Sequence, residues 1–201
     1  MGAILQSLGR TIAAGVVLLI LIIVVVGAAT GSWISLDHAW WAFFFRWLHV
    51  LSGVMWIGLL WYFNFVQTPS MPKIPDEQKP AVSKVIAPTA LFWFRWAALS
   101  TVVTGLILGG MNGYLGVLLT FAPPFTAFAI GMWLGLIMAF NVWFIIWPNQ
   151  KKALGIVPVE AAAKAAAARL AGLTSRLNTL LSIPMLFCMV AQQNNGLLPG
   201  G

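Results

Sequence analysis

The sequence predicts an all-α, polytopic integral membrane protein: a bundle of about five transmembrane helices with its N-terminus inside and its C-terminus outside. Of its 201 residues, 61% are apolar and 7% are charged, whereas a soluble domain has about 25% charged residues. The mean hydropathy is +0.93. The charges are also clustered, and a bilayer crossing needs roughly 20 apolar residues. Four stretches contain no Lys, Arg, Asp or Glu: residues 11–36, 47–72, 96–150 and 177–201.

The whole chain, residues 1–201, is predicted to form one membrane domain. The stretch from 96 to 150 must hold two helices, because Pro123 and Pro124 interrupt it near its middle. The last span is short and contains Pro184, which indicates a kinked helix. The predicted spans are residues 11–30, 47–66, 96–118, 125–147 and 177–192.

A short cytoplasmic helix is predicted between the last two spans, at residues 158–171. Pro158 suits the first turn of a helix, and Glu160 precedes Lys164 by four residues, which places opposite charges on one helix face.

The distribution of basic residues predicts the orientation. With five spans, ten of the eleven Lys and Arg residues fall on one side, and Arg46 alone falls on the other. By the positive-inside rule, we expect the N-terminus and the two long loops of this multi-pass membrane protein to face the cytoplasm.

The basic charge predicts partners among lipids. An isoelectric point near 10.2 would suit a nucleic acid only if basic and aromatic residues shared a solvated face. Here the aromatic residues lie within apolar runs, so we expect bound anionic phospholipids and no nucleic acid. The single cysteine, Cys188, excludes an intrachain disulfide, and its apolar surroundings predict an unreactive thiol.

His49 is the most specific candidate for a cofactor ligand. It shares a helix face with Gly53 and Trp56, at offsets of four and seven residues, and a small residue beside an intramembrane imidazole leaves room for a flat group such as haem b. A second haem ligand is lacking, because His38 would lie about 16 Å away along the same helix. A structural hydrogen bond to a neighbouring helix is the alternative role for His49.

Glycines at intervals of four predict close helix packing, either within the bundle or between two copies. They are Gly105, Gly109 and Gly113 in the third span and Gly131 and Gly135 in the fourth. No catalytic residue and no metal site are predicted, because the sequence shows no activated nucleophile, carboxylate pair or metal-ligand cluster, and none of the four acidic residues falls within a span.

Four segments carry a resemblance to a known family. They are residues 46–65, with Trp47, His49, Gly53, Trp56, Gly58 and Tyr62-Phe63; Phe92-Trp93-Phe94-Arg95-Trp96; residues 141–151, with Asn141 and Pro148-Asn149-Gln150-Lys151; and residues 175–187. In this order they resemble the membrane domain of bacterial urate hydroxylases, the urate-oxidase N-terminal family, over residues 41–193.

The resemblance implies a helical membrane domain that a cytochrome c domain follows in the full-length enzymes, which oxidise urate. This chain has no Cys-x-x-Cys-His haem attachment site and has Leu177 where the family often has a histidine. We therefore expect a short form that lacks the cytochrome c domain, in which only His49 carries over.

Three functions are consistent with these features. The leading hypothesis is a non-catalytic membrane subunit that packs against other subunits of a larger bioenergetic complex, respiratory or photosynthetic. The second is a redox protein in which His49 binds haem b or contacts a quinone. The third is a small-molecule permease, which would handle its substrate through neutral polar groups.

Overall fold

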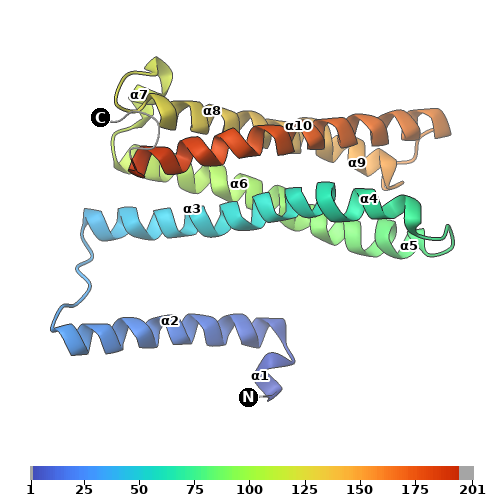
Figure 1. Cartoon of the computed structure of the whole chain (residues 1–201). Coiled ribbons are helices and arrows are strands. Elements are labelled where there is room, and N and C mark those ends of the chain that lie inside the picture. Colours follow the sequence, from blue (N-terminus) through green and yellow to red (C-terminus); the bar gives the residue numbers. More distant parts are fainter. Residues whose placement is uncertain (1, 195–201) are drawn as a thin grey trace. The chain divides into compact units, whose positions relative to one another are not determined.

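The computed structural model describes residues 2–194, and these are almost entirely helical, with no strand among them (Figure 1). The chain, expected to be one domain, divides into two compact units, Met1–Trp41 and Ala42–Gly201. Residues 195–201, where the predicted outward C-terminus falls, lie outside the described part.

The first unit consists of α1 (Gly2–Leu5), α2 (Leu8–Thr30) and the segment that follows them. Helix α2 ends at Gly31, whose φ of +67° is the left-handed conformation that favours glycine. Gly27 is the only buried residue of α2. A Cβ atom at Gly27 would lie 2.8 Å from Cε3 of Trp33, so the indole packs directly on the helix backbone.

The second unit contains four long helical segments, which together with α2 make five helices long and apolar enough to cross a membrane. The predicted helical bundle is thus confirmed. The four segments are His38–Lys73, Lys79–Met111, Thr126–Ala153 and Ala161–Gln192. Their principal helices are α3 (His38–Trp61), α6 (Ala87–Met111), α8 (Thr126–Phe140) and α10 (Ala161–Asn194).

Three of these segments extend beyond the predicted spans because π-helical turns carry the helix past a proline. The turns are η1 (Tyr62–Gln67), η3 (Val82–Ile86) and η4 (Asn141–Ile146). In each, the residue before the proline donates its N–H to the carbonyl five residues back: Thr68 to Phe63, Ala87 to Val82, and Trp147 to Val142. Such a local widening lets a membrane helix accommodate a proline that would otherwise end it.

Short elements lie at the ends of these segments or in the loops between them. They are α4 (Thr68–Ser70), η2 (Met71–Lys73), α5 (Lys79–Ala81), α7 (Leu115–Thr120) and α9 (Trp147–Ala153). The predicted hairpin between the third and fourth spans is present, with α7 in its loop.

The separate helix predicted at residues 158–171 is instead the beginning of α10, which continues without a break to Asn194. Between this region and the last predicted span, Gly172 is the only poor helix former, and one glycine costs a helix about 1 kcal/mol. A single glycine is therefore too weak a signal to end this helix.

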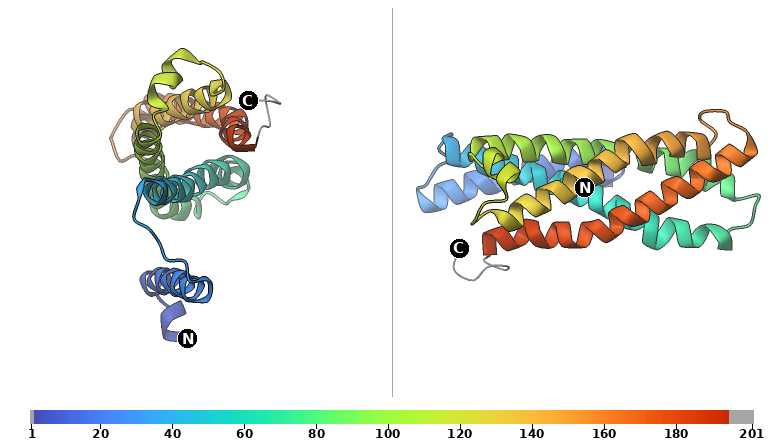
Figure 2. Two further views of the ribbon diagram at one scale, coloured as in Figure 1. Left: turned by 90° about the vertical axis from the view of Figure 1, so that its left-hand side faces the viewer. Right: turned by 90° about the horizontal axis from the view of Figure 1, so that it is seen from above.

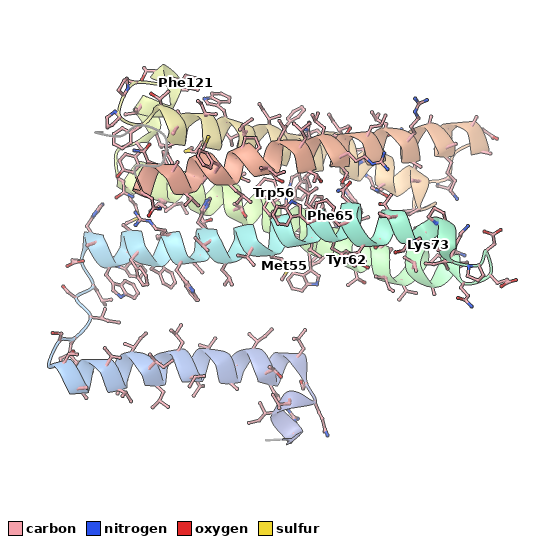
Figure 3. All side chains as sticks on the ribbon, in the orientation of Figure 1. Met55, Trp56, Tyr62, Phe65, Lys73 and Phe121 are labelled. Atoms are coloured by element: carbon pink, nitrogen blue, oxygen red, sulfur yellow. The ribbon has the colours of Figure 1, made fainter. Side chains whose placement is uncertain are left out.

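The four long helices form a ring in the order α3, α6, α8, α10, which the end-on view shows (Figure 2). Its core contains Trp56, Leu60, Phe94 and Met138, each at most 2% exposed. Figure 3 shows Trp56 on the side of α3 that faces the other helices of this unit, whereas Met55 points away from them and is 46% exposed. The outer face of the ring is thus apolar, as a lipid or protein environment requires.

Candidate functional site

His49 forms a polar link between α3 and α6. Its Nδ1 lies 2.8 Å from the carbonyl oxygen of Thr101, and because a carbonyl only accepts, Nδ1 donates the proton. The imidazole packs on Gly105: a Cβ atom there would lie 2.9 Å from Cε1 of His49 and 3.1 Å from its Nδ1. The absence of a side chain at Gly105 thus makes room for this hydrogen bond.

Gly53 and Trp56, the predicted neighbours of His49, have different surroundings. A Cβ atom at Gly53 would be 3.9 Å from Cγ2 of Thr101, which is ordinary contact. Trp56 is a core residue whose Nε1 is buried and has no hydrogen-bond partner among the described residues. The cavity described below is lined by none of these three residues.

The glycines at intervals of four have different roles. A Cβ atom at Gly131 would lie 3.1 Å from Cβ of Cys188 and 3.3 Å from the backbone nitrogen of Met189, so Gly131 lets α8 and α10 approach closely. Gly109 contacts the side chain of Leu115, Gly113 lies in the turn after α6 with a φ of +73°, and Gly135 has no neighbour within 4 Å of its Cβ position.

Each pair of neighbouring helices in the ring is joined by a hydrogen bond from a side chain. His49 connects α3 to α6, and Trp143 Nε1 donates to the carbonyl of Arg95, 3.2 Å away, to connect η4 to α6. Asn141 Nδ2 donates to Asn178 Oδ1 at 2.8 Å, which connects η4 to α10. Trp61 Nε1 donates to Oγ of Ser182 at 3.0 Å and so connects α10 to α3.

Asn178 and Ser182 are completely buried, and Asn141 is 6% exposed. Asn178 also donates from Nδ2 to the carbonyl of Met138 at 3.0 Å. The sequence analysis predicted a kinked helix in this span, although isolated amides in an apolar span also indicate interhelical hydrogen bonds.

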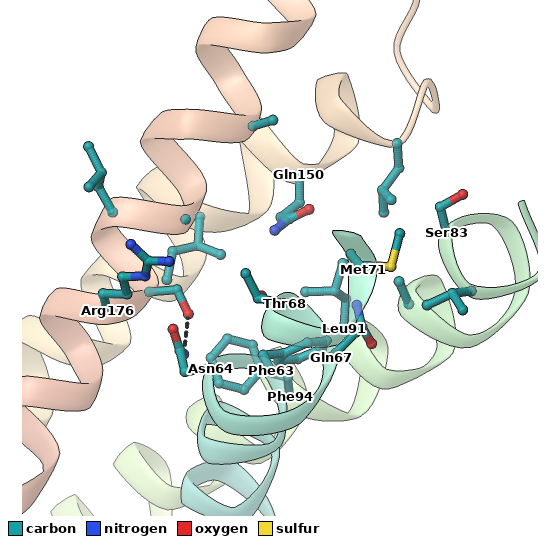
Figure 4. Close-up of a pocket in the computed structure, with 18 of the residues that line it drawn as sticks. Phe63, Asn64, Gln67, Thr68, Met71, Ser83, Leu91, Phe94, Gln150 and Arg176 are labelled. Carbon is teal, nitrogen blue, oxygen red and sulfur yellow. Dashed lines mark hydrogen bonds between the residues drawn. The ribbon is translucent and has the colours of Figure 1, made fainter. Parts of the chain in front are cut away.

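A cavity of about 320 Å³ lies at the end of the bundle that holds α4, α5 and α9 (Figure 4). Residues of all three π-helical turns line it, so the helices are widened where they surround the space. Sequence reasoning did not find this site, although a proline shortly after each turn was a visible signal. Its polar lining residues are Asn64, Gln67, Thr68, Ser83, Gln150, Arg169, Ser175 and Arg176.

The cavity is a basic and amide-rich site. No acidic residue lines it, whereas Arg169 and Arg176 do. Asn64 is held in place by donating from Nδ2 to the carbonyl of Leu60 and to Oγ of Ser175. The arrangement can bind groups that accept hydrogen bonds, and anions in particular.

No group of three or more His, Cys, Asp or Glu residues that could hold a metal ion occurs in the described part of the chain. Cys188 is a buried free cysteine beside the contact between α8 and α10.

Comparison with known proteins gives one match. The family model described as urate oxidase N-terminal matches residues 114–195, which comprise the loop with α7, the segment from α8 to α9, and α10. No curated protein and no solved structure matches this chain. Two of the four segments on which the resemblance was based, residues 141–151 and 175–187, lie inside the matched region. Residues 114–195 of this chain are thus similar to the urate oxidase N-terminal family.

Proposed function

We propose that this protein is a non-catalytic integral membrane subunit that packs against other subunits of a larger bioenergetic complex, respiratory or photosynthetic, in a bacterial inner membrane. The observation that carries the proposal is the use of the bundle's interior polar groups. His49, Asn141, Asn178 and Ser182 are each hydrogen-bonded to another helix of the ring.

This pattern supports a structural role for these groups. A catalytic acid, base or ligand needs a free lone pair or proton directed at a substrate. In this bundle, Nδ1 of His49 and the side chains of Asn141, Asn178 and Ser182 are directed at partners on neighbouring helices instead. They fix which helices are neighbours and leave an apolar outer face for lipids or partner proteins.

Helix α2 supports the proposal from the first unit. Every residue from Val16 to Val26 is an exposed, large apolar residue, so the apolar surface runs around the whole helix. Within its own unit, α2 contacts the short helix α1 and, at Gly27, the indole of Trp33. A helix that is apolar all round requires lipid or other membrane helices around it.

Site-specific photo-crosslinking in native membranes tests this proposal. A photoreactive residue placed in turn at Val17, Leu18, Leu19 and Ile20, which follow one another by about 100° around the helix, samples the perimeter of α2. We expect protein crosslinks from one side of α2 and lipid adducts from the other. The matched control is Met138, which is 0% exposed and should give no crosslink to another chain. Lipid adducts from every α2 position would contradict the subunit proposal.

The position of His49 favours a structural role over a haem b ligand, because the ring packs on the backbone of Gly105 and lies outside the lining of the cavity. Its hydrogen bond to Thr101 fits either role, since it leaves Nε2 free, and histidines that bind metals commonly donate their other ring nitrogen to a backbone carbonyl. A visible spectrum of the purified protein separates the two functions, because a haem protein would show stoichiometric absorption that His49→Ala abolishes. We expect a colourless protein.

A further inference from the structure

The cavity at the α4, α5 and α9 end is polar and charged at its rim and apolar at its floor. Arg169 and Arg176 on α10 are exposed. The floor is formed by core residues: Leu91 is 4% exposed, and Phe94 and Ile146 are each 2% exposed. A ligand that fills this space therefore needs a polar end at the rim and an apolar part beneath it.

The charges at the rim select an anion. Arg169 and Arg176 are seven residues apart on one helix, about 10 Å along its axis, and both line the cavity. Neither forms an ion pair with any described residue. The neighbouring loop contains two acids, Asp76 and Glu77, and neither lines the cavity. Asp76 is engaged by Lys79, whose Nζ lies 2.6 Å from Asp76 Oδ1, and this hydrogen bond lowers the pKa of Asp76.

Gln67 adds an unsatisfied polar group to the wall. Its side-chain oxygen is buried and has no hydrogen-bond partner in the described part of the chain. A buried oxygen without a hydrogen-bond partner is unfavourable, so an occupant that supplies one is stabilised there. A half-turn of the planar amide exchanges its oxygen and nitrogen, so Gln67 can offer either a donor or an acceptor to an occupant.

The position of the cavity favours a lipid. The loops at this end of the bundle, with the helix ends beside them, contain most of the basic residues of the chain, and a basic pocket between membrane helices on the cytoplasmic side suits an anionic lipid headgroup. A free anion would satisfy the arginines but would leave the apolar floor empty.

We propose that this cavity binds one anionic glycerophospholipid whose headgroup carries hydroxyl groups, such as phosphatidylglycerol. The phosphodiester accepts hydrogen bonds from Arg169 and Arg176, a headgroup hydroxyl bonds to Gln67, and the start of an acyl chain covers Phe94 and Ile146. This inference goes beyond the proposed function and does not depend on it, because a lipid can bind whether or not a partner subunit is present.

Native mass spectrometry of the full chain, released from nanodiscs that contain equal amounts of phosphatidylglycerol and phosphatidylcholine, tests the proposal. We expect one phosphatidylglycerol per chain, with occupancy at least tenfold lower in Arg169→Gln/Arg176→Gln. The matched control, Lys152→Gln/Lys164→Gln, removes two exposed charges from the same end but none from the cavity lining, so its occupancy should equal that of the wild type.

Further arms of the experiment distinguish a lipid site from a soluble-anion site. Inorganic phosphate, glycerol 3-phosphate and urate, each at millimolar concentration, should leave the bound lipid in place. Displacement by any of them, equal losses in the two double variants, or an empty wild-type protein would overturn the proposal. Should the arginine variant fail to fold, Thr68→Trp, which fills the cavity from an exposed position, must abolish binding with both arginines intact.

Discussion

Substitution of Gly105 by alanine tests the contact between His49 and α6. The new Cβ atom would lie 2.9 Å from Cε1 and 3.1 Å from Nδ1 of the imidazole, whereas non-bonded carbon atoms prefer about 3.5–4.0 Å. The backbone of α6 is held by its neighbours, so the ring must move. Its hydrogen bond to Thr101, now 2.8 Å long, would then break.

The expected cost follows from the loss of this hydrogen bond. A side-chain hydrogen bond between membrane helices contributes about 0.6 kcal/mol on average and about 1.7 kcal/mol at most. Residual crowding adds to this value, because overpacking costs roughly 1–3 kcal/mol where the neighbours cannot move away. We expect Gly105→Ala to lower the free energy of unfolding by about 1–2 kcal/mol, a factor of roughly 5–30 in the unfolding equilibrium.

Reversible unfolding in mixed micelles, followed by circular dichroism, measures this change. Gly135→Ala is the matched control, because the added Cβ atom would have no neighbour within 4 Å. Both substitutions replace glycine by alanine within a helix, so both change the helix propensity by the same amount. A double-mutant cycle isolates the contact: in a His49→Ala background, Gly105→Ala should cost nothing. The reasoning is refuted if Gly105→Ala behaves like the control, or if its full cost persists without the imidazole.

Three further outcomes are expected. Gly131→Ala should destabilise the protein by about 1–3 kcal/mol in the same unfolding assay, because its Cβ would meet α10 backbone atoms at 3.3–3.4 Å that cannot rotate away; unchanged stability would contradict the close approach of α8 and α10. Asn178→Leu should cost about 1–3 kcal/mol because it leaves the amide of Asn141 without its acceptor, and the double variant with Asn141→Leu should recover part of that loss; equal stability of the two variants would contradict this coupling. A reporter inserted near Pro158 should be cytoplasmic and one fused to the C-terminus periplasmic, since ten of the eleven basic residues lie on one side; a cytoplasmic C-terminal reporter would refute the five-span orientation.

The fold was predictable because hydropathy and charge clustering are strong signals in a membrane protein. A chain in lipid must satisfy its backbone hydrogen bonds internally, so it forms helices or a closed barrel. Length and apolar content are therefore enough to find five spans. The hairpin between α6 and α8 was predictable from Pro123 and Pro124. The helix ends were not, because the helices continue through Pro69, Pro88 and Pro148, which π-helical turns accommodate.

The candidate site was predictable only in part. Helical periodicity placed His49, Gly53 and Trp56 along one side of a helix, but it did not reveal that Gly105 lies against the imidazole, because this contact joins residues 56 positions apart. The cavity was missed for the same reason: its lining comes from segments far apart in the sequence, such as Gln67 and Arg176. Periodicity describes single helices, whereas pairing between helices depends on three-dimensional packing.

The role proposed for this 21.8 kDa chain is that of a structural subunit of a membrane complex. Purification from its native membranes in a mild detergent tests this claim most directly, when the subunits that migrate with it are identified and a visible spectrum is recorded after their dissociation. We predict that the chain migrates with redox or photosynthetic subunits in a fixed ratio and is itself colourless. A chain that migrates alone, or that retains stoichiometric haem lost in His49→Ala, would contradict the claim.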